Sequence, residues 1–569
     1  MSDKLEFRRV VDPRTDVNSI SRREYNIYDG GENVSYATIL PSGGVSNSQM
    51  TFICNPNDDK TFWDRRVLVR MTYVLNFTGV SAGPGIPLLQ MKGAATSIGV
   101  LPGLQNYDAP RCQPIANSLN SVNVKIGNDT ISQNPSSYTR ALSRYVNDVK
   151  QRSLLSSLSP QMLDQSITYA ELDGTNRNPL GGYGLNFQEC ARGGFTGVTI
   201  LTNTSTGIAD TASVSLECAE YLELSPFISR GATQDTAFIG FTTASIVLQL
   251  GGRGVGALSG LSAAVWSHSS LGSVLTAVTT NVTAASVLLT YIVPDSTQVI
   301  PSVNHYPYSD IGYYPTTNQN PVPALSQAIL TQNSITLNSI PSRVYIWVAP
   351  QDSSVDISST DTYFRIDNIR VIFATRISVV EATAEQLYAI ALENGCNMEY
   401  SQWTKNTGSV LALDFGKDIP LMAKEAVGKH GQFTFYVTVT CTNLSGVAVI
   451  PTISVMTLSD GVLTIDNGVV TRSVGILTES EILSSKQMPA TARRPMGDSL
   501  YGGGFWQDVG NFFKKALRPA IDVAKNLVPQ FAPQFAPLVE GVDKFAKSQG
   551  YGLVGGKSLS RASMMKRLK

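Results

Sequence analysis

Apolar and polar residues alternate along much of this chain. In GQFTFYVTVTCTN (431–443), one face of an extended strand would carry Phe433, Phe435, Val437, Val439 and Cys441, and the other face threonines and a tyrosine. This period of two is typical of a half-buried β-strand. Similar runs occupy 65–79, 196–205, 212–224, 244–251, 285–295, 342–350, 363–377 and 447–458. The pattern predicts an all-β fold.

Helical patterns are rare by comparison. The clearest is TAEQLYAIALENG (383–395), where Thr383 and Gln386 have the spacing of a capping box and Gly395 that of a C-cap. The sequence therefore predicts one well-capped helix among the strands of the second half.

The strand patterns fall into two sets, separated by a Pro- and Tyr-rich stretch at 299–323. We expect two eight-stranded antiparallel sandwiches in series, although no internal sequence repeat indicates a duplication. The predicted division is an N-terminal arm at 1–29, a first jelly roll at 30–295, a second at 296–490, a linker at 491–503, an amphipathic segment at 504–556 and a basic tail at 557–569.

Charge is sparse and unevenly spread. Charged residues make up 15% of the 569 residues, against about 25% in typical domains. Basic and acidic residues balance at 44 each, but residues 1–503 hold 33 basic and 40 acidic residues. A body with that net charge is not expected to bind a phosphate backbone through bulk charge.

The cysteines and the N-terminus indicate the compartment. The six cysteines are far apart and form no CxxC pair, and MSDKLEFRRVV has no apolar signal-peptide core. We expect reduced, mostly buried thiols in a protein that is made inside the cell. No apolar run is long enough to span a bilayer, because Arg253 and many glycines interrupt the most hydrophobic region.

The search for catalytic chemistry finds little. The three histidines are widely spaced, and the glycine run GGRGVG (251–256) lacks the lysine and spacing of a phosphate loop, so it predicts a turn. The acids Asp58, Asp59 and Asp361 could be imagined as glycosidase carboxylates, but solvated loop acids are far commoner. We expect no enzyme, cofactor or metal. A β-sandwich carbohydrate-binding protein or glycosidase remains the alternative from another functional class.

Several phrases resemble a known family. Residues 53–79, 287–316 and 340–373, together with EQLYAIALENGCNMEYSQWT (385–404), are similar to major capsid (hexon) proteins of the polinton–adintovirus–adenovirus lineage. The resemblance spans roughly 50–490 and depends on the order of patterns. It implies a double jelly roll whose homotrimers, with penton or minor capsid proteins, form an icosahedral shell around double-stranded DNA, assembled in the cytoplasm or the nucleus.

A second capsid architecture is also compatible with the chain. A small-virus protein would have one shell jelly roll, a projecting β domain and a lytic C-terminal peptide. Such shells usually hold their genome with an Arg-rich N-terminal arm, whereas MSDKLEFRRVVDPRTDVNSISRRE mixes both signs of charge. This observation favours the double jelly roll.

Loop aromatics are candidates for contacts between subunits, because aromatic side chains concentrate at interface hot spots. Core packing is the commoner role for any one of them. With few charges available, we expect apolar burial more than ion pairs to hold the oligomer. The candidate anchors are Trp63, Tyr306, Tyr308, Tyr313, Tyr314 and Trp403.

An amphipathic segment rich in apolar residues lies near the C-terminus. In LYGGGFWQDVGNFFKKAL (500–517), helical spacing would place an apolar stripe opposite lysines and other polar side chains. Such a helix can lie in a membrane interface, or dock on the inner face of a shell. The stripe and its neighbours are Phe505, Trp506, Val509, Phe512, Phe513 and Leu517.

Two glycine pairs bracket this segment. LYGG|G places a cleavage point between Gly503 and Gly504, and LVGG|K places one between Gly556 and Lys557. Both resemble the [Met/Ile/Leu]-x-Gly-Gly-x signal of the adenovirus-type cysteine protease, and a further glycine pair stands in NPLGGYG (178–184), where a folded loop is expected. The resemblance implies that 504–556 is released like protein VI of adenoviruses to act on a host membrane. The basic remainder would face the viral DNA through Lys557, Arg561, Lys566, Arg567 and Lys569.

Overall fold

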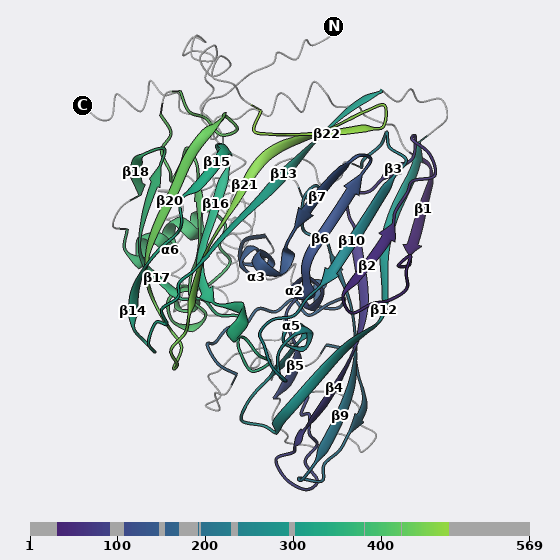
Figure 1. Cartoon of the computed structure of the whole chain (residues 1–569), viewed down its shortest axis with the longest axis vertical. Coiled ribbons are helices and arrows are strands. Elements are labelled where there is room, and N and C mark those ends of the chain that lie inside the picture. The colour runs from purple at the N-terminus through teal and green to yellow at the C-terminus, as the bar shows by residue number, and fades with distance from the viewer. Residues whose placement is uncertain are drawn as a thin grey trace, which may run out of the picture. The chain divides into compact units, whose positions relative to one another are not determined.

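The computed structural model describes residues 31–91, 107–146, 154–169, 192, 195–228, 237–294, 302–379, 382–422 and 424–476. These residues form mostly antiparallel strands (Figure 1). All of them lie within one compact unit of the chain. The predicted segments 1–29, 491–503, 504–556 and 557–569 lie outside the described residues.

The first jelly roll consists of two facing sheets. One sheet has the order β1-β12-β4-β9-β8, with β3 also pairing β12, and the other has the order β2-β10-β6-β7. The strands are β1 (Gly31–Ile39), β2 (Gln49–Ile53), β3 (Phe62–Trp63), β4 (Leu68–Val80), β6 (Leu119–Ile126), β7 (Asp129–Gln133), β8 (Val198–Asn203), β9 (Asp210–Tyr221), β10 (Ala244–Leu250) and β12 (Val274–Pro294). A short ribbon, β5 (Asp108–Pro110) with β11 (Trp266–His268), lies beside them.

The second jelly roll repeats the same arrangement. Its sheets have the orders β13-β21-β16-β19, with β22 on β21, and β14-β20-β17-β18, with β15 on β20. The strands are β13 (Val303–Thr317), β14 (Gln327–Thr331), β15 (Ile335–Ser339), β16 (Arg343–Pro350), β17 (Arg365–Phe373), β18 (Arg376–Val379), β19 (Val410–Asp414), β20 (His430–Thr442), β21 (Pro451–Asp466) and β22 (Val469–Val474).

Eight strands in each half can be numbered 1 to 8 in chain order. In the first half they are β1, β2, β4, β6, β7, β9, β10 and β12, and in the second they are β13, β14 and β16 to β21. Both halves then have one sheet with the order 1-8-3-6 and one with the order 2-7-4-5. This is the strand order of a jelly roll, in which two Greek keys close a double sheet. The predicted double jelly roll is confirmed. The alternative with one shell jelly roll and an unlike projecting domain is wrong, because the second half has the complete strand order.

The alternation seen in the sequence produces the cores. In β20, Phe435, Val437, Val439 and Cys441 are buried, and the threonines between them lie half-buried on the other face. Period-two side chains point to opposite faces of a strand, so one face fills the space between the sheets. The burial part of the cysteine prediction is confirmed, because the five described cysteines are buried and none of them forms a disulfide.

Helices are short and few among the described residues. They are α2 (Pro114–Ser118), α3 (Pro135–Val146), α5 (Leu261–Val265) and α6 (Ala384–Glu393), with a 3-10 turn η3 (Asp352–Ser354) and a π-helical turn η4 (Gln402–Asn406). The predicted cap of α6 is confirmed: Thr383 and Gln386 form the capping box, and Gly395 follows with φ of 96°.

The candidate aromatic anchors require a correction. Trp63, Tyr306, Tyr308 and Trp403 are buried, and Tyr313 and Tyr314 are half-buried. None of the six lies in an exposed loop, since Trp63 is in β3, the tyrosines are in β13 and Trp403 is in η4. The Pro- and Tyr-rich stretch that was expected to separate the two halves is largely strand β13, in which Asn304, Tyr306 and Tyr308 bury one face.

Candidate functional site: the junction between the two jelly rolls

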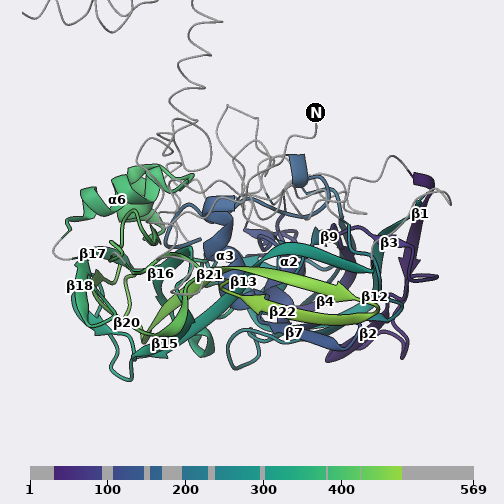
Figure 2. The ribbon, with the colours of Figure 1, turned by 90° about the horizontal axis from the view of Figure 1, so that it is seen from above.

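The second jelly roll reaches the first through a ribbon of three strands, β13, β21 and β22. Figure 2 shows this ribbon extending from the second jelly roll toward β7 of the first. Five of its side chains are buried in the hydrophobic core of the first jelly roll: Tyr306, Tyr308, Leu463, Ile465 and Val470. One ribbon therefore closes its own sandwich at one end and covers its neighbour at the other.

The tip of the ribbon fits the turn between β6 and β7. The Val470 N–H donates to Asn128 Oδ1 at 2.7 Å, and Arg472 Nε lies 2.6 Å from Asp129 Oδ2. A Cβ on Gly127 would stand 2.8 Å from Val470 Cγ2, and its φ is +60°. Glycine is the residue that tolerates both the approach and the backbone angle.

A helix makes the reverse connection. α3 follows β7 of the first jelly roll, yet Tyr138, Ala141, Leu142 and Tyr145 are buried in the core of the second. These positions follow the i, i+3, i+4, i+7 spacing of one helix face. The Tyr145 hydroxyl donates to the Val410 carbonyl of β19 at 2.5 Å, so the helix is hydrogen-bonded to the second jelly roll as well as packed on it.

A buried ionic cluster lies at the same junction, centred on Asp361 of the second jelly roll. Its Oδ1 accepts from Arg140 Nη1 and Arg253 Nη1, each at 2.7 Å, and lies 3.3 Å from Arg111 Nη1. All three arginines come from the first half of the chain. Burial alone would raise the pKa of Asp361, but the three guanidinium groups together hold that pKa well below its ordinary value.

A second acid extends the cluster. Asp164 pairs with Arg192, and both side chains are fully buried. The other carboxylate oxygen of Asp164 accepts from the Tyr169 hydroxyl and from the Asp361 N–H, each at 2.7 Å. Arg111 also donates to two carbonyls of the second jelly roll, at 3.0 and 3.2 Å.

The cluster fixes position more than it adds stability. Buried ion pairs gain little net free energy over apolar packing, but losing one partner is costly because the other charge stays desolvated. Slippage between the jelly rolls would separate Asp361 from its arginines. The junction therefore holds the two jelly rolls in one arrangement.

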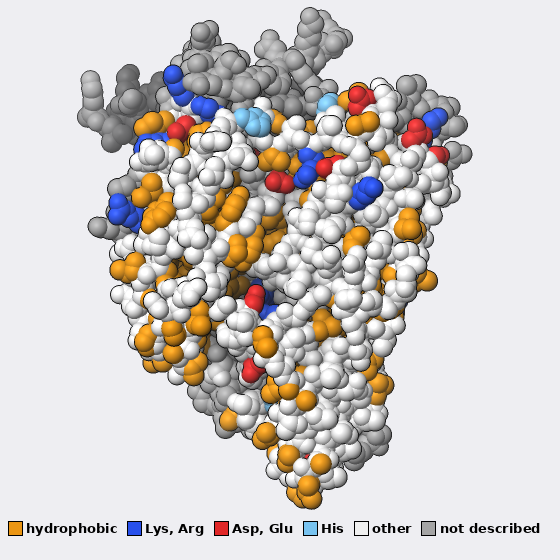
Figure 3. Space-filling view, viewed as in Figure 1, with side chains coloured by type: hydrophobic (Ala, Val, Ile, Leu, Met, Phe, Trp, Pro, Cys, Tyr) orange, Lys and Arg blue, Asp and Glu red, His pale blue; other side chains and the backbone are white. Residues whose placement is uncertain are grey.

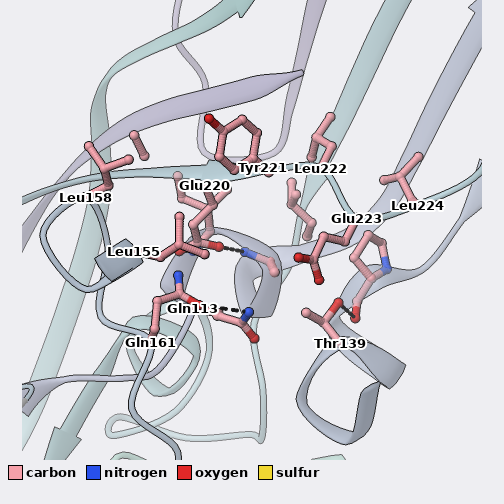
Figure 4. A pocket seen from close by; sticks show the side chains of 15 residues that line it. Gln113, Thr139, Leu155, Leu158, Gln161, Glu220, Tyr221, Leu222, Glu223 and Leu224 are labelled. Atoms are coloured by element: carbon pink, nitrogen blue, oxygen red, sulfur yellow. Dashed lines mark hydrogen bonds between the residues drawn. The ribbon is translucent and has the colours of Figure 1, made fainter. Parts of the chain in front are cut away.

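A pocket opens near this junction, between β9, α2, α3 and residues 155–161 (Figure 4). It encloses about 580 Å³, part of it open to solvent. Glu220 lies in it, buried, and accepts from the N–H groups of Ile115 and Ala116 at 3.0 and 2.8 Å and from Ser159 Oγ at 2.6 Å. Burial raises the pKa of Glu220 to about 7, although these three donors oppose the rise.

Catalytic and metal-binding constellations do not emerge from the described ranges. No group of three His, Cys, Asp or Glu side chains in them could hold a metal ion, and none of the helices found there is long and apolar enough to cross a membrane. The GGRGVG run forms the predicted turn, with Gly254 and Gly256 at positive φ.

The sequence-predicted site residues meet three different outcomes. The cleavage residues Gly503, Gly504, Gly556 and Lys557, the apolar stripe of 505–517 and the basic residues of 557–569 all lie outside the described residues. Asp58 and Asp59 are exposed loop acids, as expected.

Asp361 is not a solvated acid, because three arginines and the core surround it. Sequence reasoning missed the junction altogether, since Asp361 is more than a hundred positions away from each of its three arginines. The only signal was that Arg253 interrupts the most hydrophobic region.

Family models match both halves of the chain. The Sputnik virophage major capsid protein 1st domain matches residues 6–291. The major capsid protein V20 C-terminal domain matches residues 312–407 and 402–461. A curated relative, the putative capsid protein V20 of Sputnik virophage, is 26% identical over 98% of this chain and 98% of its own length.

Solved structures agree with these matches. The Sputnik virophage structure at 3.5 Å by cryo-EM contains a chain that is 26% identical, with a TM-score of 0.69 over 88% of this chain and 98% of that chain. The mavirus major capsid protein, at 13% identity, gives a TM-score of 0.62 over 80% and 92%, which shows a shared fold.

The comparisons confirm a capsid protein with a double jelly roll, and the first family model and the V20 relative come from a virophage. The finer resemblance to polintons, adintoviruses and adenoviruses, and the likeness of 504–556 to protein VI, stay predictions. The first family model spans half of the sequence and the V20 relative nearly all of it. The chain belongs to the family of virophage major capsid proteins.

Proposed function

We propose that this protein builds an icosahedral capsid as pseudo-hexameric homotrimers. The observation that carries the proposal is the pair of complete jelly rolls held in one arrangement by the buried Asp361 cluster and the β13–β21–β22 ribbon. Each chain then supplies two corners of a hexagon, and three copies related by a threefold axis supply six. One gene product can thereby tile a shell.

The experiment is to purify the full chain, measure its mass in solution by light scattering, and image it by negative-stain electron microscopy. We expect trimers with hexagonal outlines, and closed particles at high concentration or with minor capsid and penton proteins. Chains that stay monomeric under all these conditions would contradict the proposal. Turnover of glycans by the purified protein would instead favour the carbohydrate-active alternative.

We further propose that the C-terminal region is processed. A viral cysteine protease cleaves after Gly503 and Gly556, and the released 504–556 segment acts on a host membrane through Phe505, Trp506, Val509, Phe512, Phe513 and Leu517. The support is the pair of Gly-Gly signals that bracket one amphipathic stretch. Interfacial binding grows with the buried apolar area and with basic residues facing anionic lipid.

Mass spectrometry of mature particles tests the processing. Expected products are a chain that ends at Gly503 and a peptide of 504–556. Chains intact through Lys569 would contradict it. A synthetic 504–556 peptide should release dye from anionic liposomes, and a peptide with Trp506 and Phe512 changed to serine should not.

The remaining tail, 557–569, carries five basic residues and no acid. We propose that it faces the packaged DNA, since this charge can neutralise a few phosphates. Binding of a 557–569 peptide to duplex DNA should weaken steeply as salt rises. Binding that is independent of salt, or absent at low salt, would contradict the proposal.

A further inference from the structure

The first jelly roll has a ribbon that corresponds to the one at the junction, and its end is bare. β1 lies at the edge of its sheet and pairs with β12 alone. Asn33, Val34, Ser35 and Tyr36 are all exposed, so both faces of this part of β1 are uncovered by the described residues. Tyr36 keeps 83% of its surface accessible. A two-faced, unpaired edge is normally covered in the working assembly.

Strand register shows which residues correspond. The last pair between the third and eighth strands is Leu68–Leu288 in the first jelly roll and Arg343–Leu458 in the second. Five residues further along the eighth strand, Val293 pairs with Asn33. In the second jelly roll, the residue five positions beyond Leu458 pairs with Tyr306.

Asn33 therefore occupies the position in the first jelly roll that Tyr306 occupies in the second. Tyr306 is buried against the other jelly roll, whereas Asn33 is exposed.

The strand beside the ribbon corresponds as well. Trp63 of β3 pairs with Tyr291, and Val474 of β22 pairs with Gly461, three residues past the reference pair in both cases. The correspondence ends with the two-residue strand β3. Asp59, in the loop before it, accepts a hydrogen bond from the Gly240 N–H, and Gly240 packs beside Ile465 of the junction ribbon, so this loop belongs to the contact inside the chain.

The receiving surface also has a counterpart. Gly127 and Asn128 form the two-residue turn between the fourth and fifth strands of the first jelly roll, and Ala374 and Thr375 form that turn in the second. Thr375 is exposed. Arg376, next to it, pairs with Glu425 and so ties the turn to the loop before β20.

We infer that the end of the β1–β12 ribbon of one copy docks on the β17–β18 turn, and on the adjoining loop around Met422 and Lys424, of the next copy. The inference rests on the proposed trimer. Within each chain, the ribbon of the second jelly roll docks on the first jelly roll. In the trimer, the ribbon of each first jelly roll would dock in the same way on the second jelly roll of the next chain, so that six jelly rolls form a closed ring. The occupant of the bare ribbon is a second copy of this protein.

Exposure supports this pairing. Tyr36 is 83% exposed on the ribbon, and Met422 is 56% exposed on the receiving loop. In the face drawn in Figure 3, charged side chains of both signs lie over the upper part of the molecule, on the second jelly roll and at the edge near β1 and β3. Exposed apolar side chains beside a polar rim are typical of contacts between subunits that are soluble before assembly.

The test is site-specific cross-linking of the full chain. Asn33→Cys and Thr375→Cys are combined with Cys190→Ser, because the five described native cysteines are buried. A short bis-maleimide linker avoids the strict geometry of a disulfide. We expect covalent dimers and trimers on a denaturing gel. The matched control replaces Asn33→Cys by Thr276→Cys, an exposed site at the other end of β12, and should stay monomeric on the gel.

Oligomeric state separates the possible failures. If light scattering shows trimers but no cross-links form, this docking is wrong and the proposed trimer still stands. Residues 1–30 or 477–569 of the same copy would then be the occupant of the ribbon. Equal cross-linking in the control also overturns it. Monomers in solution overturn both the docking and the trimer.

Discussion

The ribbon ends of the two jelly rolls have the same strand order and opposite surroundings. The ribbon of the second jelly roll buries Tyr306, Tyr308 and Ile465 against its neighbour, whereas that of the first exposes Asn33 and Ser35. A contact within one chain forms at high effective concentration and never has to be soluble alone. A contact between chains must stay soluble until assembly. The difference indicates what decides how apolar each surface is. Whether the contact forms within one chain or between chains matters more than the fold, which is the same in both.

The largest effect is expected at the tethered junction. Asp361→Ala leaves three buried guanidinium groups without their shared carboxylate, so the free energy of unfolding should fall by about 3–5 kcal/mol. Chemical denaturation of the full chain at fixed concentration measures it. Asp352→Ala is the matched control, because Asp352 contacts two of the same arginines with a side chain that is 62% exposed.

The control should lose at most about 1 kcal/mol, as expected of exposed pairs. Equal losses in the two variants would mean that burial of Asp361 is not what makes the cluster decisive.

The two tyrosines of the ribbons sharpen the comparison. Tyr306→Ala removes a ring that packs edge-on against Phe238, with centroids 5.2 Å apart, and should cost about 3–5 kcal/mol of unfolding free energy. Tyr36→Ala, at the exposed ribbon, should leave the unfolding free energy unchanged within about 0.5 kcal/mol.

Thermal unfolding of isolated subunits and light scattering of trimers separate the two effects. Tyr36→Ala should weaken only trimer formation. Loss of subunit stability on changing Tyr36 would place that residue in the core of its own chain.

A smaller effect concerns Glu220, in the pocket of the first jelly roll. The pKa of Glu220 is raised from 4.5 to about 7 in the folded chain. Because the folded pKa is above the unfolded one, this group favours the folded state below pH 4.5, and that contribution is lost as the pH rises to about 7. A shift of this size corresponds to about 3 kcal/mol.

Glu220→Gln should remove this part of the pH dependence. The measurement is the free energy of unfolding of both proteins from pH 4.5 to above 7. The slope is the readout, because the amide group of glutamine facing two backbone N–H groups lowers stability equally at every pH. Parallel curves for the two proteins would contradict the raised pKa.

The sequence predicted the fold well because strand alternation is local. Phe435, Val437 and Val439 indicate a half-buried strand without knowledge of any partner, and Thr383 with Gln386 indicates a helix start. By contrast, the sequence predicts Tyr306 and Tyr308 to be loop aromatics, because nothing in their own stretch indicates that one face of it lies against the other jelly roll. Burial by a distant segment leaves no periodic signal of its own.

The site could not be predicted for the same reason. Asp361 and Arg140 are separated by 221 residues, and each looks like an ordinary surface charge in its own stretch. The membrane-active and cleavage residues show the reverse case. Their spacing from Phe505 to Leu517 and the flanking glycine pairs are local patterns, so the sequence proposes a role for them that the described residues do not test.

The smallest expected effect separates two views of the contact between copies. Sparse charge predicts trimers held by apolar burial, which should survive high salt. The docking inferred here brings the exposed Lys424 to the contact and predicts that salt weakens the trimer. The Debye length shortens from about 10 Å at 0.1 M salt to about 3 Å at 1 M. Exposed ion pairs contribute up to about 1 kcal/mol each to the free energy of association. The dissociation constant should therefore rise by a factor of about 5 per pair, measured by light scattering on dilution. Lys424→Ala should flatten this salt dependence, while Lys125→Ala, an exposed lysine on β6, should leave it as it is. Trimers whose dissociation ignores salt in all three proteins would favour apolar burial.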